Sequence, residues 1–203
     1  AEALQSLLET IANDAVINVL PIAAVSIQQQ SQSLVDMKAL KSSGAVAFSD
    51  DGQPVSNNLL MREALQQAKE HQLLIIDHCE DHSLVNKGVI NEGKKSQELK
   101  LPGISALSEE LPIVRDIMLA HDVDYKLHIA HISTEGAAKI IKEAKDRGIR
   151  VTCEVTPHHI ALSDDIITAG YTDCKVNPPL RSNGDREAMK QALKANVIDV
   201  IAT

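Results

Sequence analysis

Three short apolar runs in the middle of the chain each end in residues that can bind a metal ion. The runs are Ala45-Val-Ala-Phe-Ser-Asp-Asp-Gly, Leu73-Leu-Ile-Ile-Asp-His-Cys-Glu and Leu127-His-Ile-Ala-His-Ile-Ser. A short apolar run bounded by turn residues is typical of a buried parallel strand. The carboxyl ends of parallel strands open onto one face of an α/β barrel, where such barrels keep their chemistry. A carboxylate and two imidazoles brought to that face predict a divalent metal site.

Strand and helix patterns alternate along the rest of the chain, which predicts βαβ units and a parallel sheet. Strands are expected at 16–20, 45–48, 73–77, 125–132, 149–155 and 197–202, with a short extended run at 174–177. Helices are expected at 1–13, 33–41, 58–71, 108–121, 135–147, 164–169 and 185–195. Residues 80–108 lack sustained periodicity, and a loop of that length inside a domain is usually functional or mobile. No repeat or linker interrupts the chain, so residues 1–203 are predicted to form one domain.

Composition excludes several classes of function. The net charge is −8, whereas nucleic-acid binders carry basic patches, and two Tyr, one Phe and no Trp leave little for base stacking. No apolar run approaches membrane-spanning length, and the first residues show no basic segment followed by an apolar one, as a secretory leader would. Cys79, Cys153 and Cys174 are odd in number and widely spaced, which predicts reduced thiols in a cytoplasmic protein.

Each candidate ligand also has a purely structural interpretation. Asp50-Asp51-Gly52 resembles a turn in which Asp accepts backbone hydrogen bonds, and His78 could be a hydrogen-bonded core residue. His128 and His131 point to opposite faces if both lie on one strand, so only one of them is expected to be a ligand. Three successive strands end in Asp, His and His. This joint pattern favours a metal site over three unrelated structural roles.

Two further segments carry polar residues with less specific patterns. Thr156-Pro-His-His159 is either a fourth source of ligands or a polar loop. Asn177-Pro-Pro-Leu-Arg181 is a rigid turn that could direct an amide and a guanidinium at a ligand.

Seven motifs, in order along the chain, together resemble bacterial class I dihydroorotase of the amidohydrolase superfamily. They are Phe48-Ser-Asp-Asp-Gly, Asp77-His-Cys-Glu-Asp, Asn91-Glu-Gly with Leu101-Pro-Gly-Ile, His128-Ile-Ala-His-Ile-Ser, Glu154-Val-Thr-Pro-His-His, Lys175-Val-Asn-Pro-Pro-Leu-Arg and Asp199-Val-Ile-Ala-Thr. The resemblance implies an α/β fold, a (β/α)8 TIM barrel of the amidohydrolase type, with two Zn²⁺ ions. It also implies the reversible cyclisation of N-carbamoyl-L-aspartate to L-dihydroorotate in pyrimidine biosynthesis.

Carried over residue by residue, the resemblance makes Asp51 the carboxylate that bridges the two ions. His78 and His131 become ligands of the second ion, and Asn177 a contact to the substrate. Asp51 is preferred to Asp50 because it stands 27 positions before His78, the spacing associated with this family; Asp50 stays open as the alternative. His131 is preferred to His128 because the family's ligand stands just before the x-Ser that ends the strand.

Several parts of the family pattern have no counterpart in these residues. The His-x-His pair of the first strand, the Arg beside it and an Asn of the second strand are missing. No general acid/base lies within the chain, because the Asp with that role is expected just after Thr203. The expectation is therefore an incomplete barrel, a fragment that binds at most one Zn²⁺ and that by itself is inactive, since losing a general acid/base costs about 10²–10⁴ in rate.

Three other functions remain open at this stage. One is another cyclic amidohydrolase of the allantoinase or hydantoinase type, and another is a non-catalytic scaffold for aspartate transcarbamoylase. The third is an α/β domain without a site. The expected partners are a small-molecule substrate and a second copy of the chain in a homodimer, with aspartate transcarbamoylase as a further partner and neither nucleic acid nor membrane.

Overall fold

The computed structural model describes residues 2–170 and 172–203. The strands are β1 (Ile22–Ala23), β2 (Ala47–Phe48), β3 (Ile76–Asp77), β4 (Ile90–Asn91), β5 (Gly103–Ile104), β6 (Leu127–Ile129), β7 (Val151–Val155) and β8 (Val200–Ile201). The helices are α1 (Glu2–Asp14), α2 (Met37–Ser42), α3 (Asn58–His71), α4 (His82–Val85), α5 (Lys94–Leu99), α6 (Leu107–Val123), α7 (Glu135–Asp146), α8 (Pro157–Ala161) and α9 (Asn183–Lys194). Two 3₁₀ turns, η1 (Ile27–Gln29) and η2 (Asp164–Ile166), complete the set.

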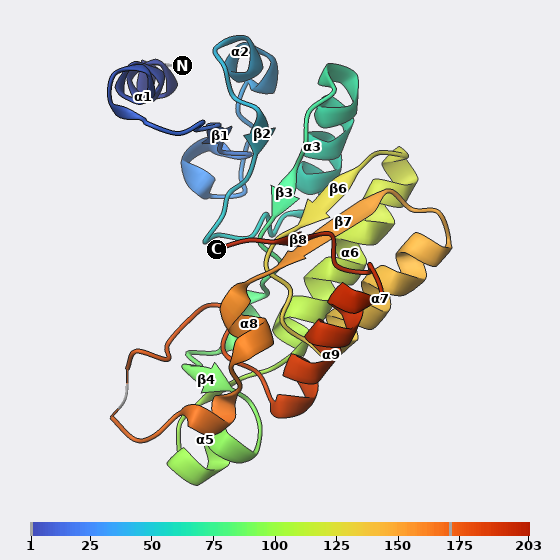
Figure 1. The fold of residues 1–203 in the computed structure, drawn as a ribbon. Coiled ribbons are helices and arrows are strands. Elements are labelled where there is room, and N and C mark those ends of the chain that lie inside the picture. The colour runs from blue at the N-terminus through green and yellow to red at the C-terminus, as the bar shows by residue number, and fades with distance from the viewer. Residues whose placement is uncertain (1, 171) are drawn as a thin grey trace.

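Six of these strands form a parallel series in chain order. β1 pairs with β2, and β3, β6, β7 and β8 pair in that order, all in parallel. A parallel bridge between Phe48 and Ile75 joins β2 to the residue preceding β3. Each strand is connected to the next by at least one helix (Figure 1). Parallel strands with helical crossovers are the repeating unit of a (β/α)8 barrel, so the fold is α/β and the barrel is incomplete, as predicted.

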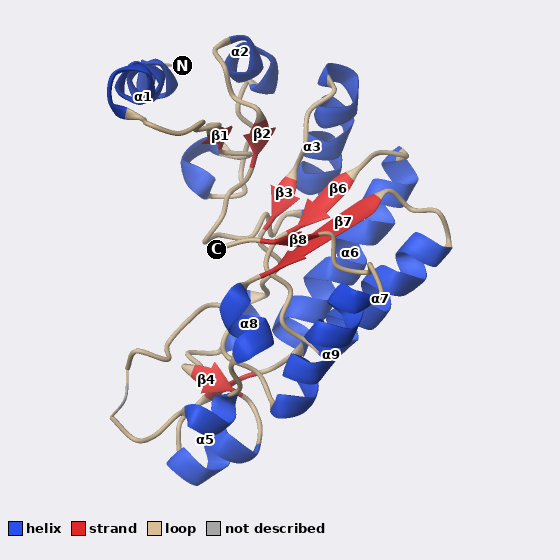
Figure 2. Cartoon of the chain, viewed as in Figure 1, coloured by secondary structure: helices blue, strands red, loops and turns tan. Residues whose placement is uncertain are grey.

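Helices cover one side of the strand series. Figure 2 shows the strands in the middle of the molecule with helices beside them. α3 packs on α6, α6 on α7 and α7 on α9, so the four helices form one layer. Their buried faces meet fully buried strand residues such as Phe48, Ile129 and Val155 in a common hydrophobic core. This core holds the strand ends, and the loops that follow them, in fixed relative positions.

Local sequence signals explain where the main helices begin. Asn57 caps α3 by accepting hydrogen bonds from two backbone N–H groups, and Thr134 caps α7 by accepting one from Ala137 N. Ser182 and Asp185 form a reciprocal capping box at the start of α9. Such caps satisfy N–H groups that have no partner inside the helix.

The predicted first strand was wrong in position. Residues 16–20 form no strand, and Val16 is 98% exposed, while β1 lies at Ile22–Ala23. The ladder starts at Pro21, whose carbonyl accepts from Val46 N, and it ends where Ser49 N donates to the Ala23 carbonyl. The neighbouring run of β2 is short, so residues before Pro21 extend past its end and find no pairing partner.

The segment after β3 is more ordered than its sequence predicted. It contains α4, the parallel pair β4–β5 and α5, and Figure 1 shows β4 and α5 away from the main strand series. Gly103 allows the close pairing, because a Cβ there would lie 2.6 Å from Glu92 Cα. α8 was also missed, since Thr156-Pro-His-His159 caps and begins a helix, and the run 174–177 forms no strand.

Ala1, the first residue of the expected N-terminal helix, lies outside the described residues. Among the helices that the structure describes, none combines the length and apolar character needed to cross a membrane.

Candidate metal centre

Asp51, His78 and His131 come together at the carboxyl ends of three neighbouring strands. Asp51 lies three residues beyond β2, His78 directly follows β3, and His131 lies two residues beyond β6. His78 Nδ1 lies 2.9 Å from His131 Nε2. Asp51 Oδ1 lies 3.7 Å from that His78 nitrogen and 3.5 Å from that His131 nitrogen. Three donor atoms from three elements therefore face one point.

The structure gives Asp50 and Asp51 different surroundings. Asp50 is 1% exposed, and its carboxylate accepts hydrogen bonds from Val25 N at 2.8 Å, from Ser26 N at 3.1 Å and from Ser26 Oγ at 2.5 Å. It ties the end of β2 to the end of β1. The Asp51 side chain is 68% exposed and faces the two histidines. Asp50 is thus committed to the fold, while Asp51 has free oxygen atoms.

His131 adopts a backbone conformation that is unusual for its residue type. Its φ is +33°, in the left-handed region that side chains other than Gly rarely occupy. The chain leaves β6 at this point, and Ile132 N donates to the Glu154 carbonyl at 2.9 Å. Backbone strain of this kind costs on the order of 1–3 kcal/mol and is often found at functional sites. Here it turns the imidazole of His131 toward Asp51 and His78.

His128 makes a different set of contacts, because it lies on β6 while His131 lies beyond the end of that strand. Its Nδ1 lies 2.8 Å from Thr152 Oγ1, and its Nε2 lies 3.2 Å from Glu154 Oε2. Both partners lie on β7. The interaction with His128 lowers the pKa of Glu154. Of the two histidines, only His131 joins Asp51 and His78.

Glu80 stands behind His78 and was not predicted. His78 Nε2 is buried without a hydrogen-bond partner among the described residues, and the nearest acidic oxygen is Glu80 Oε2 at 3.6 Å. The interaction with His78 lowers the pKa of Glu80, and the amide of Asn177 contributes to that lowering. A carboxylate on one ring nitrogen of a histidine directs the lone pair of the other nitrogen outward. Glu80 therefore places its carboxylate beside Nε2, while the other ring nitrogen, Nδ1, faces Asp51.

The charges within the group also act on one another. Burial by itself would lower the pKa of His131, but the Asp51 carboxylate outweighs that effect and the pKa is raised. The same interaction with His131 is the largest cause of the lowered pKa of Asp51. Asp51 is therefore ionised over the whole physiological range, as a metal ligand must be.

The donor set suits a zinc ion. Zn²⁺ takes imidazole nitrogen and carboxylate oxygen at about 2.0–2.2 Å, and catalytic sites use three protein ligands plus water. Glu80 lies 3.6 Å from the ring nitrogen of His78 that is not in the donor group, on the side where metal-bound histidines have a carboxylate or another acceptor. The separations of 2.9, 3.5 and 3.7 Å between the three donor atoms are close to the edge of about 3.3 Å in a tetrahedral zinc site. The residues present therefore fit the ion.

A second group of possible ligands already contains a positively charged partner. Asp77, Cys79 and Asp116 are buried together, and Arg115 Nη2 lies 2.7 Å from Asp116 Oδ1 and 3.5 Å from Asp77 Oδ2. Burial and the neighbouring Asp116 raise the pKa of Asp77 well above its usual range. Burial also raises the pKa of the Cys79 thiol well above its usual range. The Arg115 guanidinium therefore already neutralises part of the charge that a cation would need here.

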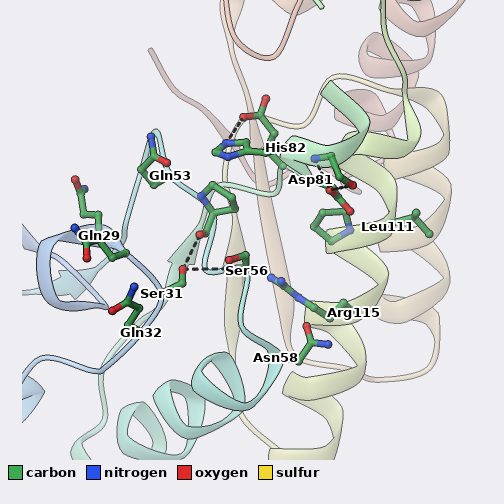
Figure 3. A pocket seen from close by; sticks show the side chains of 15 residues that line it. Gln29, Ser31, Gln32, Gln53, Ser56, Asn58, Asp81, His82, Leu111 and Arg115 are labelled. Carbon is green, nitrogen blue, oxygen red and sulfur yellow. Dashed lines mark hydrogen bonds and ion pairs between the residues drawn. The ribbon is translucent and has the colours of Figure 1, made fainter. Parts of the chain in front are cut away.

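A cavity of about 830 Å³ adjoins the candidate centre (Figure 3). Its walls come from the loops after β1, β2 and β3 and from α6, and they include Gln29, Ser31, Gln53, His82 and Arg115. Glu80 also lines it, so the residue that contacts His78 faces this space as well. His82 Nε2 reaches Glu80 Oε2 at 3.1 Å from the other side.

Comparison with known proteins identifies the family. The family model described as dihydro-orotase-like matches residues 1–137. The chain belongs to the dihydroorotase family. Enzymes of this family are generally metal-dependent, and Asp51, His78 and His131 form a candidate metal-binding group.

Curated relatives agree with the family model. The chain is 47% identical over 187 residues to the dihydroorotase of Syntrophus aciditrophicus, covering 92% of this chain and 44% of the relative. It is 44% identical over 202 residues to the dihydroorotase of Macrococcus caseolyticus, covering 100% of this chain and 47% of the relative. The chain thus spans less than half the length of these relatives.

Solved structures with the same fold include hydantoinases of lower sequence identity. D-hydantoinase from Bacillus sp. AR9 superposes with a TM-score of 0.76 at 21% identity, covering 98% of this chain and 47% of that chain. L-hydantoinase from Arthrobacter aurescens superposes with a TM-score of 0.74 at 18% identity, covering 98% of this chain and 46% of that chain. At this identity the likeness establishes the barrel fold alone.

Proposed function

We propose that the protein containing this dihydroorotase-family chain is a zinc-dependent dihydroorotase that interconverts N-carbamoyl-L-aspartate and L-dihydroorotate. The convergence of Asp51, His78 and His131 from three strand ends is the observation that supports this most. The relatives at 44–47% identity favour dihydroorotate over a hydantoin as substrate, because the hydantoinase structures are only 18–21% identical. A purely structural domain has no need for a strained His131 facing a carboxylate.

In this proposal each residue of the centre has a defined task. His78 and His131 supply imidazole nitrogens to one zinc ion, and Asp51 supplies an oxygen to it. The exposed Asp51 side chain leaves its second oxygen free for another ion, which is what a bridging carboxylate requires. When bound, zinc ions lower the pKa of a shared water and polarise the scissile carbonyl.

The supporting residues hold this arrangement without touching the reacting atoms. Glu80 lies 3.6 Å from His78 Nε2, the ring nitrogen that faces away from Asp51. Asn177 lies close enough to Glu80 to affect its pKa, so its exposed amide is available to a substrate at the mouth of the site. The proton transfer that opens or closes the ring is assigned to a carboxylate outside these residues, expected just after Thr203.

The central test is an ultraviolet assay of dihydroorotate on the full-length protein, with zinc content measured after dialysis. We expect turnover with two zinc ions per protein, and no detectable turnover in His131→Ala. The 203-residue chain alone should hold at most one ion and should not turn over. Hydantoin and allantoin serve as control substrates: turnover of either in preference to dihydroorotate would identify another cyclic amidohydrolase, and metal binding without any turnover would identify a scaffold.

We also propose that these residues belong to a single barrel domain in a cytoplasmic enzyme. The common hydrophobic core supports the single domain, and three free cysteines support the compartment.

Exposed apolar residues on the outermost strands, among them Ile22, Val200 and Ile201, support association with a second copy. Light scattering of the full-length protein, alone and mixed with aspartate transcarbamoylase, tests the homodimer and this partner.

A further inference from the structure

Arg181 occupies the middle of a buried polar network beside the candidate metal centre. It is 3% exposed, so its guanidinium does not reach toward a ligand as the sequence suggested. Its Nε donates to Ser133 Oγ at 3.0 Å, and its Nη2 donates to Glu109 Oε2 at 3.4 Å. Its Nη1 donates to Asn91 Oδ1 and to the Ile104 carbonyl, both at 3.2 Å. One side chain therefore joins three other segments of the chain.

Glu109 carries this network to the loop of a proposed zinc ligand. Its carboxylate accepts from Ser133 N at 2.8 Å and from Thr134 N at 3.3 Å, and it forms a short hydrogen bond with Ser133 Oγ. Ser133 and Thr134 follow His131 by two and three residues. The Glu109 carboxylate thus fixes the backbone just after the residue whose φ is positive.

The other end of the network holds the turn that carries Asn177. Arg181 stands four residues after Asn177, and its carbonyl accepts from Asp164 N at 2.8 Å. The Asp164 carboxylate in turn accepts from Asn91 Nδ2 at 3.0 Å. The same turn is held from α8, where His159 Nε2 lies 3.1 Å from the Pro178 carbonyl. Both ends of the turn are therefore anchored to buried partners.

We propose that Arg181 is a positioning residue, which sets the loop of His131 and the turn of Asn177 relative to each other. This inference rests on the proposed function, because it assigns His131 to the metal and Asn177 to the substrate. Arg181 is suited to the task, since a planar guanidinium offers five N–H donors in fixed directions. It makes four of its contacts to residues that are 48, 72, 77 and 90 positions away in the sequence.

The test uses the full-length protein with Arg181→Met, Arg181→Lys and Ser133→Ala, and Arg62→Met as the control. Arg62 forms an exposed ion pair with Asp122 on the outer helices. Cobalt replaces zinc, because its visible spectrum reports ligand geometry. Loss of a residue that supports a ligand costs about 10–100-fold in metal affinity. We expect that loss and an altered cobalt spectrum in Arg181→Met, a smaller loss in Arg181→Lys and Ser133→Ala, and neither in Arg62→Met.

Two further readouts separate positioning from general stability. In the metal-free protein, amide hydrogen exchange should quicken at Ser133 and Thr134 in Arg181→Met and stay unchanged in Arg62→Met. Dihydroorotate KM should rise in Arg181→Lys, through the displaced Asn177. If Arg181→Met does not fold, Ser133→Ala and Arg181→Lys decide by the same measurements.

The outcomes distinguish this inference from the proposed function. Wild-type protein that binds no cobalt between Asp51, His78 and His131 would refute the proposed function. Wild-type protein that binds cobalt, with Arg181 and Ser133 variants of equal affinity and identical spectrum, would refute the positioning role alone. Variants that lose only thermal stability, with unchanged metal affinity, cobalt spectrum and KM, would likewise refute the positioning role and show that Arg181 only stabilises the fold.

Discussion

Asp50 and Asp51 are adjacent in the sequence, and replacing each in turn separates support of the fold from metal binding. Asp50→Ala removes the acceptor of the Val25 and Ser26 backbone N–H groups and of the Ser26 hydroxyl. Asp51→Ala removes an oxygen that faces His78 and His131. The two variants have the same change in composition and charge, so each serves as the control for the other.

The expected magnitudes follow from burial. A buried donor left without an acceptor costs about 1–3 kcal/mol, so two orphaned N–H groups lower the free energy of unfolding by roughly 2–6 kcal/mol in Asp50→Ala. The Asp51 side chain is 68% exposed, and surface substitutions usually change stability by less than about 0.5 kcal/mol. Metal affinity should show the opposite order. Asp51→Ala loses a direct ligand, so its zinc affinity should fall by more than the roughly 10–100-fold that follows loss of a residue that only supports a ligand.

The assay pairs urea unfolding of the metal-free protein with a zinc-competition titration of the folded protein. Unfolding is measured at about pH 8.5, because Asp51 raises the pKa of His131 and the stabilising effect of that charge is lost as the pH rises. Equal loss of stability in both variants would refute the assignment of separate roles. Normal zinc affinity in Asp51→Ala, with loss in Asp50→Ala, would show that Asp50 is the ligand.

Two other predictions concern titration. Burial lowers the pKa of His159 to about 4 from its ordinary 6.5, so the unfolded chain binds this proton first as the pH falls. The free energy of unfolding should therefore drop between pH 6.5 and 4 by about 3 kcal/mol from this group, and urea titrations of His159→Gln should show a shallower dependence; an identical slope would contradict the assignment. Burial raises the pKa of the Cys153 thiol to about 12 and that of Cys79 well above its usual range. Iodoacetamide should alkylate the partly exposed Cys174 of the native protein at least about 10-fold faster than either, as read by peptide mass spectrometry, and equal rates would contradict the burial.

The strand series was predictable because its signals are local. The apolar runs that contain β2, β3, β6, β7 and β8 each stand between turn residues, and the core packs them in parallel. Val16–Leu20 carries the same local signal but lies beyond the end of its partner strand. Strand pairing depends on the neighbour as well as on the residues themselves, and a single segment does not reveal its neighbour's length.

The site was predictable to the extent that it follows strand ends. Asp51, His78 and His131 each follow a strand, so their meeting is a consequence of the parallel order. Glu80 had a weak signal, two residues after His78 in the same polar strand end. Glu109 had none, because it lies in the first turn of α6 and meets Arg181 from 72 positions away. Contacts of that range depend on how the loops fold over the barrel.

The most direct test of the proposed metal centre is a crystal structure of the full-length protein with anomalous data at the zinc edge. We predict a peak within about 2.0–2.2 Å of His78 Nδ1, His131 Nε2 and an oxygen of Asp51. That peak should disappear in His131→Ala while Glu80 and His78 stay in place. A peak that lies away from these three atoms, or zinc that is retained there without His131, would contradict the assignment.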